Sequence, residues 1–315
     1  MIAVVLHIET MNRFEDMDTF LRIIDAGGIS KAAVKKGIAK SALSRRLSDL
    51  EHRLGAQLVN RSTRGLSLTE AGRSFYERCK RIMEDVDEAE QMVSADSTEL
   101  RGTISMTAAL SFGVLHLGPL INVFLNQHPD LAIDLDLTDR RVELIEEGID
   151  LAIRIGRLSD SRLIARKLAP MRRIACASPA YLKTHGTPHS PRDLRNHIGL
   201  ASGLLPDSIY WQFTGNNGEN ITGRPTSRLR ANNGDVLVQA ACEDMGICAV
   251  PLFISSRAIK RGDLVPILTD FRLREDGIYA VYPPARYQSH RVRMLIDFLA
   301  REYGADPSWE LGLFN

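Results

Sequence analysis

The sequence has 315 residues, a formal net charge of +1, and a composition of 44% hydrophobic and 25% charged residues. This length suits two or three domains of about 100–200 residues each, and the composition is typical of a globular protein. No apolar run approaches the roughly 20 residues of a membrane span, and the chain does not open on a secretory signal, so we expect a cytoplasmic protein that contacts no membrane.

The charges are unevenly distributed, although the whole chain is nearly neutral. Between residues 11 and 69 the basic side chains outnumber the acidic ones. A basic end on such a chain predicts a local surface that binds a polyanion. Residues 1–10 match no recognisable element; we expect a tail there, with Met11 and Met17 as alternative starts of translation.

The basic segment has the pattern of a compact helical domain. Apolar residues at helical spacing predict a helix over 14–26, ended by a glycine pair. Ser30 is expected to cap a short helix over 31–36, and a third helix is expected over 40–54. Two short helices joined by a tight, glycine-containing turn are typical of a helix-turn-helix, so residues 11–69 are predicted to bind DNA.

A wing and a long helix follow this domain. Short strands at 57–59 and 66–68 flank a turn with arginines, and Thr69 is expected to cap a helix that continues to about Asp96. Its apolar residues recur at alternating spacings of four and three, which predicts pairing with a second helix over residues 70–98. The alternative is a helix packed against its own chain. The seam consists of Phe75, Cys79, Ile82, Val86, Ala89 and Val93.

From residue 99 to 305 the pattern changes to strands alternating with helices, which predicts an α/β domain with a mainly parallel sheet. Strands are expected at 102–107, 131–137, 150–155, 163–168, 172–177, 247–250, 264–268 and 278–282. Helices are expected at 113–127, 140–147, 179–185, 234–245, 252–260 and 290–302. The length fits two lobes, one of about 101–170 with 271–303 and one of about 171–270, before a tail at 306–315.

Several ordered motifs carry a resemblance to a known family. The first stretch contains Ala32-Ala33, Gly37-Ile38, Ser41-Ala42-Leu43-Ser44-Arg45-Arg46-Leu47, Leu50-Glu51 and Leu54-Gly55. Further motifs are Leu58-Val59-Asn60-Arg61-Ser62-Thr63-Arg64, Leu68-Thr69-Glu70-Ala71-Gly72, Asp139-Arg140-Arg141, Asp150-Leu151-Ala152-Ile153-Arg154, Cys176-Ala177-Ser178-Pro179 and Gly246-Ile247. Over about residues 11–303 the chain resembles LysR-type transcriptional regulators, which implies a winged helix-turn-helix, a dimerisation helix and a two-lobed effector domain like that of periplasmic binding proteins. Ala39 departs from the family, which often has a capping Ser there, and Lys36 stands where Leu is common.

This resemblance and the helix-turn-helix geometry predict the residues that contact double-stranded DNA. The second helix of such a motif inserts its N-terminal residues into the major groove, where Lys and Arg pair with guanine, and the wing contacts the backbone or the minor groove. The predicted DNA contacts are Ser30, Lys31, Lys40, Ser41, Ala42, Ser44, Arg45, Arg46, Arg61, Thr63 and Arg64. The family further implies a homodimer or homotetramer, and RNA polymerase as a partner if the protein is an activator.

The resemblance also implies a small-molecule effector in the cleft between the two lobes. An arginine and backbone N–H groups near strand ends favour a small organic acid. The predicted effector contacts are Thr107, Ser111, Phe112, Arg154, Gly156, Ser202, Gly203, Asn232 and Asn233. A solute-binding protein without a DNA-regulatory role is the alternative, and the basic helix-turn-helix argues against it.

Other chemistry has little support in the sequence. The motifs of metalloproteases, P-loop enzymes, serine hydrolases and dinucleotide enzymes do not occur, so we expect no enzyme, metal or cofactor. His185 and His189 lie on a loop without further ligands, which favours a polar turn over a metal site. Cys242 and Cys248 could form a redox switch, but their apolar surroundings favour a structural role.

Overall fold

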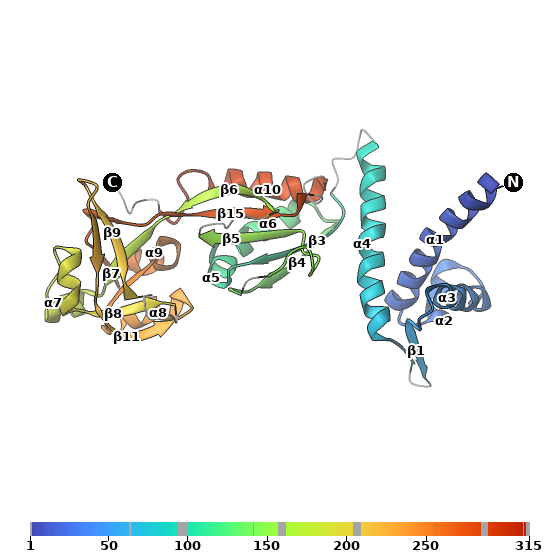
Figure 1. Ribbon diagram of the computed structural model, residues 1–315, viewed down its shortest axis with the longest axis horizontal. Helices are drawn as coiled ribbons and strands as arrows, with labels where there is room; N and C mark the ends of the chain where they lie inside the picture. The colour runs from blue at the N-terminus through green and yellow to red at the C-terminus, as the bar shows by residue number, and fades with distance from the viewer. Residues whose placement is uncertain are drawn as a thin grey trace. The chain divides into compact units, whose positions relative to one another are not determined.

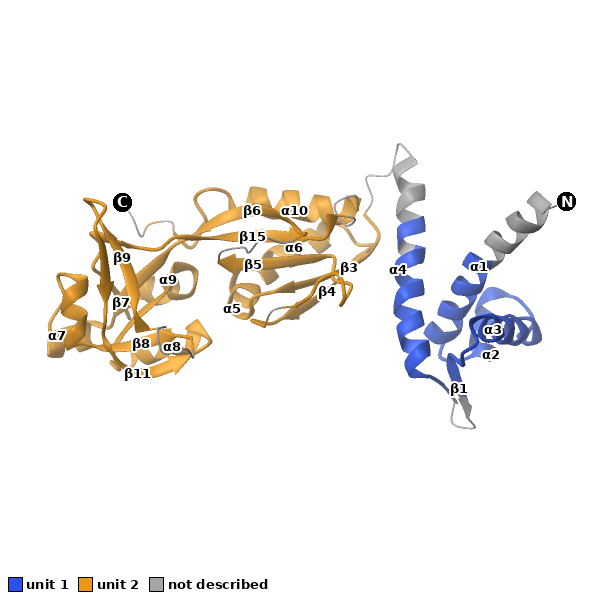
Figure 2. Cartoon of the chain, in the orientation of Figure 1, with its two compact units in different colours: residues 1–98 blue, residues 99–315 orange. Residues whose placement is uncertain are grey.

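The structure is a computed structural model that describes residues 2–62, 65–93, 100–140, 142–156, 162–203, 209–284, 289–310 and 312. At 2–12, 61–62, 65, 84 and 87–93 the description covers the backbone alone. The chain divides into two compact units, Met1–Thr98 and Glu99–Asn315, which are treated separately (Figure 2).

The first unit consists of helices followed by a hairpin and a long helix (Figure 1). The elements are α1 (Ile2–Asp25), α2 (Ile29–Lys36), α3 (Lys40–Leu54), β1 (Val59–Ser62), β2 (Gly65–Leu68) and α4 (Glu70–Val93). α1 begins at Ile2, so the segment 2–10 is helical where the sequence predicted a tail. α2 begins at Ile29 with Gly28 as its N-cap, so Ser30 lies inside the helix and does not cap it.

The core of this unit is formed by one face of each helix. Leu43, Leu47 and Leu50 of α3 are each 1% exposed and pack with Phe20 and other apolar residues of α1 and α2. Gly72 lets α4 approach the chain before the wing, since a Cβ there would lie 1.9 Å from the carbonyl oxygen of Leu58.

The N-terminus of α3 lacks a side-chain cap. Ala39 has the extended backbone of an N-cap residue (φ −63°, ψ 137°) but offers no oxygen to the free N–H groups of the first turn. Ala39→Ser therefore raises the free energy of unfolding of this unit by about 1 kcal/mol. Chemical denaturation of the full chain measures the gain. Ala39→Val, which adds bulk without an acceptor, is the control, and equal stability of the two variants would refute the capping explanation.

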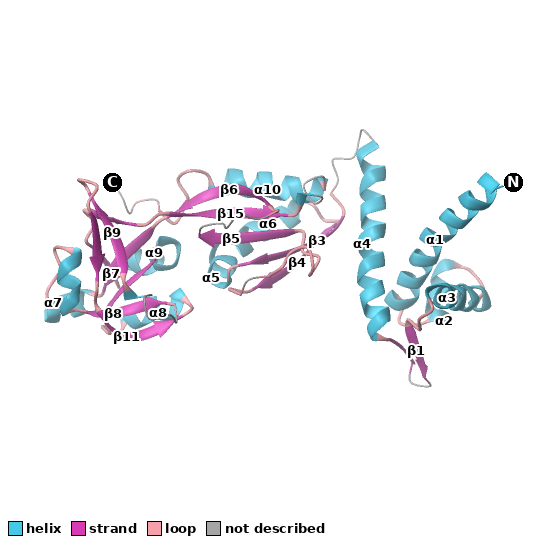
Figure 3. Ribbon diagram, viewed as in Figure 1, coloured by secondary structure: helices cyan, strands magenta, loops and turns pink. Residues whose placement is uncertain are grey.

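The second unit contains two five-stranded sheets, a three-stranded sheet and covering helices (Figure 3). Its strands are β3 (Gly102–Ala108), β4 (Leu131–Leu137), β5 (Leu151–Gly156), β6 (Ile164–Met171), β7 (Arg173–Ala177), β8 (Ile198–Ser202), β9 (Trp211–Gly215), β10 (Asn220–Gly223), β11 (Thr226–Ala231), β12 (Ile247–Pro251), β13 (Val265–Ile267), β14 (Phe271–Leu273) and β15 (Asp276–Tyr282). Its helices are α5 (Leu110–Phe112), the π-helical η1 (Gly113–Leu117), α6 (Gly118–Gln127), α7 (Pro179–His185), the 3₁₀ helix η2 (Pro191–Asn196), α8 (Gly234–Cys242), α9 (Leu252–Arg261) and α10 (His290–Tyr303).

Each five-stranded sheet is the centre of one lobe. The first has the order β4-β3-β5-β15-β6 and the second has the order β11-β8-β12-β7-β13. The chain passes between them twice, from β6 to β7 and from β14 to β15. Both sheets are mixed: β3 is parallel to β4 and β5, while β15 is antiparallel to β5 and β6. The expected mainly parallel sheet is thus parallel only in part.

Three expected features of this unit differ in the structure. The segment 142–149 forms a turn in place of a helix, because Gly148 takes a positive φ of 66° and Ile149 N–H closes back on the carbonyl of Leu144. The segment after α10 is not a free tail, since Trp309 and Glu310 are 4% and 7% exposed. α8 ends earlier than expected, at Cys242.

Within the described residues, no helix combines the length and the apolar character that crossing a bilayer requires.

Candidate nucleic-acid interface and effector cleft

The helix α3 presents polar residues on the face opposite its leucines. Lys40, Ser41, Ala42 and Arg45 are exposed, while Ser44 is half-buried. Arg45 extends into solvent with its side chain 87% exposed, and its Nε lies 3.9 Å from Asp49. The first turns of α3 therefore offer cationic and hydroxyl groups that a DNA groove can reach.

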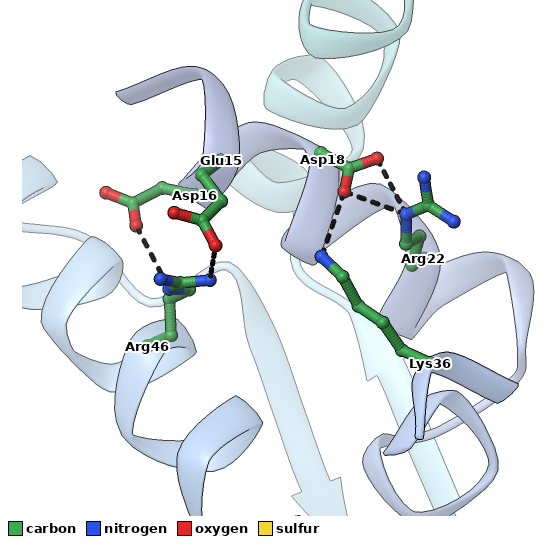
Figure 4. Close-up of polar contacts among 6 residues, drawn as sticks. All are labelled: Glu15, Asp16, Asp18, Arg22, Lys36 and Arg46. Atoms are coloured by element: carbon green, nitrogen blue, oxygen red, sulfur yellow. Dashed lines mark hydrogen bonds and ion pairs between the residues drawn. The ribbon is translucent and has the colours of Figure 1, made fainter. Parts of the chain in front are cut away.

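Arg46 differs from its neighbours, because its guanidinium points to α1 (Figure 4). Nη1 donates to Glu15, and Nε lies 3.9 Å from Oδ1 of Asp16. Arg53 also donates to Asp16, at 2.8 Å, and the Asp16 side chain is only 8% exposed. Although the sequence predicted a DNA contact, the structure places Arg46 in the ion pairs that fix α3 against α1.

Lys36 is likewise engaged within the unit (Figure 4). Its Nζ donates to Oδ2 of Asp18 at 3.2 Å, and Arg22 donates to Oδ1 of the same carboxylate at 2.7 Å. Burial alone would raise the pKa of Asp18, but the hydrogen bonds from Arg22 and Lys36 outweigh it and lower the pKa. This explains a lysine where the family often has leucine: Lys36 joins α2 to α1 by an ion pair.

Two other cations of α2, Lys31 and Lys35, are exposed. Ser30 and Lys31 are exposed in the first turn, and Lys35 lies one turn after Lys31. Residues four apart share a helix face, so Lys31 and Lys35 form one cationic edge. The sequence analysis missed Lys35, although the spacing from Lys31 was visible.

The wing is an antiparallel hairpin of β1 and β2, in which Arg61 lies opposite Leu66. Glu51 holds its first strand, because Oε1 accepts from the N–H groups of Leu58 and Val59 at 2.8 and 3.1 Å. Thr63 and Arg64 lie outside the described residues, as does the side chain of Arg61.

The long helix α4 starts as predicted, since Thr69 Oγ1 accepts from Gly72 N–H at 2.9 Å. The predicted seam is partly used within the chain. The Phe75 ring lies 5.5 Å from Phe20 of α1, and Cys79 is fully buried, which raises its pKa to about 11. Ile82 and Val86 are half-buried, and the side chains of Ala89 and Val93 lie outside the described residues.

In the second unit, two predicted effector contacts, Ser111 and Asn233, meet between the lobes. Ser111 follows β3, and Asn233 precedes α8 of the other lobe. Ser111 Oγ accepts from Asn233 Nδ2 at 3.3 Å and donates to Asp235. Asn233 Oδ1 also caps α8, accepting from the N–H of Asp235 at 2.9 Å. Ser202 ends β8 and Gly203 follows it, and the N–H of Gly203 donates to the carbonyl of Ala231, just before the exposed Asn232.

Two polar groups of the first lobe are buried without partners among the described residues. Thr107 is 0% exposed and its hydroxyl has no hydrogen bond, and Nη2 of Arg154 also lacks one. Nη1 of Arg154 reaches the carbonyl of Arg140 at 3.4 Å, and burial lowers the pKa of Arg154. Thr107 of β3 lies opposite Ala152 of β5, and Ala152 shares a sheet face with Arg154 two residues later. The side chains of Thr107 and Arg154 therefore lie on the same face of the sheet. Gly156 then ends β5 at a φ of 117°.

Phe112 is not available to a ligand, in contrast to the prediction. It is 0% exposed, and its ring lies 5.8 Å from Trp309 and 5.3 Å from Phe253. The residue belongs to an aromatic cluster with His116, Phe253, Tyr303 and Trp309.

His116 links this cluster to the second lobe, because its Nε2 lies 3.0 Å from the carbonyl oxygen of Phe253 in α9. Burial lowers the pKa of His116 below 6.5, although that hydrogen bond opposes the shift. The unfolded chain then binds a proton that the folded chain excludes, so the second unit loses stability as the pH falls below 6.5.

We expect this loss as a fall in melting temperature between about pH 7.5 and about pH 5.5. His116→Gln retains a donor for Phe253 and makes the fall smaller, because it removes the titrating group. The exposed His189→Gln is the control. A pH dependence identical in wild type and His116→Gln would contradict the prediction.

The remaining cysteine and histidine alternatives have structural explanations. Cys248 lies opposite Cys176 on paired strands with the two sulfur atoms 3.5 Å apart, and its hydrogen bond and burial raise the pKa of Cys176. A thiol with a raised pKa is a poor nucleophile. The redox pair considered from the sequence was Cys242 and Cys248, but the sulfur that Cys248 contacts is that of Cys176. His185 stacks on Tyr181 with centroids 4.3 Å apart.

The chain matches two family models. Residues 14–73 match "Bacterial regulatory helix-turn-helix protein, lysR family" and residues 97–304 match "LysR substrate binding domain". The HTH-type transcriptional regulator CrgA of Neisseria meningitidis is 33% identical over 92% of this chain and 97% of its own. PtxR of Pseudomonas aeruginosa is 33% identical over 91% and 92%.

Solved structures are similar over the same length. The structure of CrgA matches with a TM-score of 0.59 and 32% identity, over 91% of this chain and 98% of that one. The full-length structure of the Vibrio cholerae virulence activator AphB matches with a TM-score of 0.56 and 29% identity, over 90% and 97%.

Proposed function

Because the chain belongs to the LysR family of transcriptional regulators, we propose that it reads its operator mainly through the first two turns of α3. The proposal rests on a difference among the basic residues of the first unit, some of which are ion-paired with α1 while others are exposed. Arg46, Arg53 and Lys36 pair with acidic residues of α1, whereas Lys40 at the start of α3 has no ion pair among the described residues and Arg45 is almost fully exposed.

The other proposed contacts are with the DNA backbone, with base edges and with the minor groove. Ser30 and Lys31 are exposed in the first turn of α2, where helix N–H groups favour phosphate. Ser41, Ala42 and Ser44 would contact base edges, and Arg61, Thr63 and Arg64 of the wing would contact the backbone or the minor groove. We assign Arg46 a structural role.

Oligomerisation would use the later turns of α4. Phe75 packs on Phe20 of α1 and Cys79 is fully buried, so the seam proposed for a second copy runs through Ile82, Val86, Ala89 and Val93. A dimer built on it would bind two half-sites in the cytoplasm, and RNA polymerase would be a partner if the protein activates transcription.

The effector proposed for the cleft is a small organic acid. The support comes from Arg154, which has a buried nitrogen without a partner, and from the nearby unpartnered hydroxyl of Thr107. A carboxylate would supply the acceptor that both groups lack. Ser111 and Asn233 lie on opposite lobes and hydrogen-bond to each other. This contact would change if ligand binding altered the angle between the lobes.

The test is a thermal-shift screen of small organic acids against the full chain, followed by titration of the hits. Arg154→Gln lowers the affinity for a cleft ligand by about 10- to 100-fold, because a hydrogen bond to a charged group is worth about 1.5–3 kcal/mol. Arg228→Gln removes an exposed arginine of β11 and is the matched control. Hits that bind Arg154→Gln as tightly as wild type would rule out this cleft chemistry.

A further inference from the structure

A cavity lies in the lobe that contains β7, at the point where the chain passes between the lobes. Its volume is about 100 Å³, and Phe213, Ile267, Phe271 and Leu273 form much of its wall. Cavities of about 150 Å³ hold one benzene ring, so this smaller cavity has room for a short aliphatic chain. Its lining includes none of the residues proposed for the effector cleft.

The charges around this cavity leave one arginine without a hydrogen bond. Arg172 donates to Glu310 at 2.6 Å and lies 3.5 Å from Glu275. Arg173 lies 3.8 Å from Asp276, and it donates no side-chain hydrogen bond to the described residues. Asp276 is shared with Arg274, at 3.7 Å.

The Arg173 side chain is 31% exposed, and its burial lowers the pKa of the guanidinium although the Asp276 carboxylate opposes the shift. A partly buried cation whose carboxylate partner lies beyond hydrogen-bond distance gains from an incoming anion, above all from a carboxylate that can accept two parallel N–H bonds. Arg172 and Arg272 add positive charge to the lining, against one acidic residue, Glu275.

The backbone of the cavity wall is strained. Leu268 takes a positive φ of 55°, one of two described residues other than glycine to do so. A residue other than glycine is strained in this left-handed conformation, and such strain collects at ligand sites. The strained residue lies in the turn that connects β13 to β14, beside the apolar wall.

We propose that this cavity is a second ligand site, which binds a small monocarboxylate with an apolar body through Arg173. Both segments that cross between the lobes line it, the first with Arg172 and Arg173 and the second with Leu273 and Glu275. An occupant therefore touches the two hinge segments directly and restrains the angle between the lobes.

The probe is 4,4,4-trifluorobutanoate, whose short apolar chain suits a cavity of this volume, and its binding to the full chain is followed by fluorine NMR. We expect saturable binding with a Kd below about 1 mM. Arg173→Met weakens it by at least about tenfold, while the exposed Arg228→Met leaves it unchanged. The neutral 4,4,4-trifluorobutanamide binds wild type at least about tenfold more weakly, a comparison that holds even if Arg173→Met fails to fold.

Three results would overturn the proposal. They are no saturation by 4,4,4-trifluorobutanoate, equal binding of the carboxylate and the amide, or loss of binding in Arg154→Gln with retention in folded Arg173→Met. The last result would locate the probe in the effector cleft, and so would reject the hinge site while supporting the cleft. Failure of the cleft proposal leaves the hinge test intact, because the two arginines are tested separately.

Discussion

Alanine in place of Lys40 or Arg45 lowers the affinity for the operator by about 5- to 100-fold, because one good contact to a base edge is worth about 1–3 kcal/mol. Both side chains are exposed on the first two turns of α3. If Lys40 reads a base, its loss relaxes the preference at one position. If Arg45 holds a phosphate, its loss lowers affinity for all sequences and reduces the salt slope by about one.

Fluorescence anisotropy with operator and scrambled duplexes at several salt concentrations measures these effects. Arg228→Ala in the second unit removes the same charge and serves as the control. Arg46→Ala gives a contrasting pattern: it lowers the melting temperature of the first unit, since it removes a partner of the buried Asp16. Operator binding of both Lys40→Ala and Arg45→Ala within about twofold of wild type would contradict the assignment.

Trp309→Ala destabilises the second unit by about 3–5 kcal/mol, a typical cost of truncating a buried tryptophan. The ring is 4% exposed and lies 4.6 Å from His116, 5.6 Å from Tyr303 and 5.8 Å from Phe112. For a unit of this size the loss corresponds to a fall in melting temperature of about 6–20 °C.

Thermal unfolding of the full chain, followed by near-ultraviolet circular dichroism, measures this fall. Tyr210→Ala is the matched control, because it removes an aromatic ring that is 47% exposed, and we expect it to change stability by less than about 0.5 kcal/mol. If both variants melt within about 2 °C of wild type, the segment after α10 contributes nothing to the core.

The sequence predicted the helix-turn-helix because its signals are local. The leucines of α3 recur at helical spacing, and Thr69 occupies the cap position that the structure confirms. The C-terminal segment shows the limit of such reasoning. Trp309 packs against rings from α5 and α9, contacts between residues far apart in the chain that a local pattern does not contain.

The same limit applies to the short strands β8 to β11, which the sequence analysis did not identify. β11 reads Thr-Ser-Arg-Leu-Arg-Ala and lies at the edge of its sheet, where pairing with β8 decides its conformation and its composition does not. The turn at 142–149 carries helix-forming residues, but Gly148 ends it after one turn.

For the candidate sites, the sequence pointed to regions of the chain, and the structure shows which residues of each region are exposed and which pack within the protein. Arg45 and Arg46 are adjacent in the motif, yet Arg45 extends into solvent while Arg46 pairs with Glu15. Ser111 and Phe112 are adjacent too, but Ser111 hydrogen-bonds to Asn233 of the opposite lobe, whereas Phe112 is buried in the aromatic cluster. These differences depend on the partner helices, which a single motif does not reveal. The remaining predicted contacts stay predictions.

Sequence-specific DNA binding through α3 is tested most directly by selection of genomic fragments with the purified full chain, in competition with bulk DNA and at several salt concentrations. We expect enrichment of a partly symmetric site whose half-sites are spaced by whole helical turns, with binding reduced by Lys40→Ala. Uniform weak binding to all sequences, explained by salt alone and unchanged by that substitution, would contradict it.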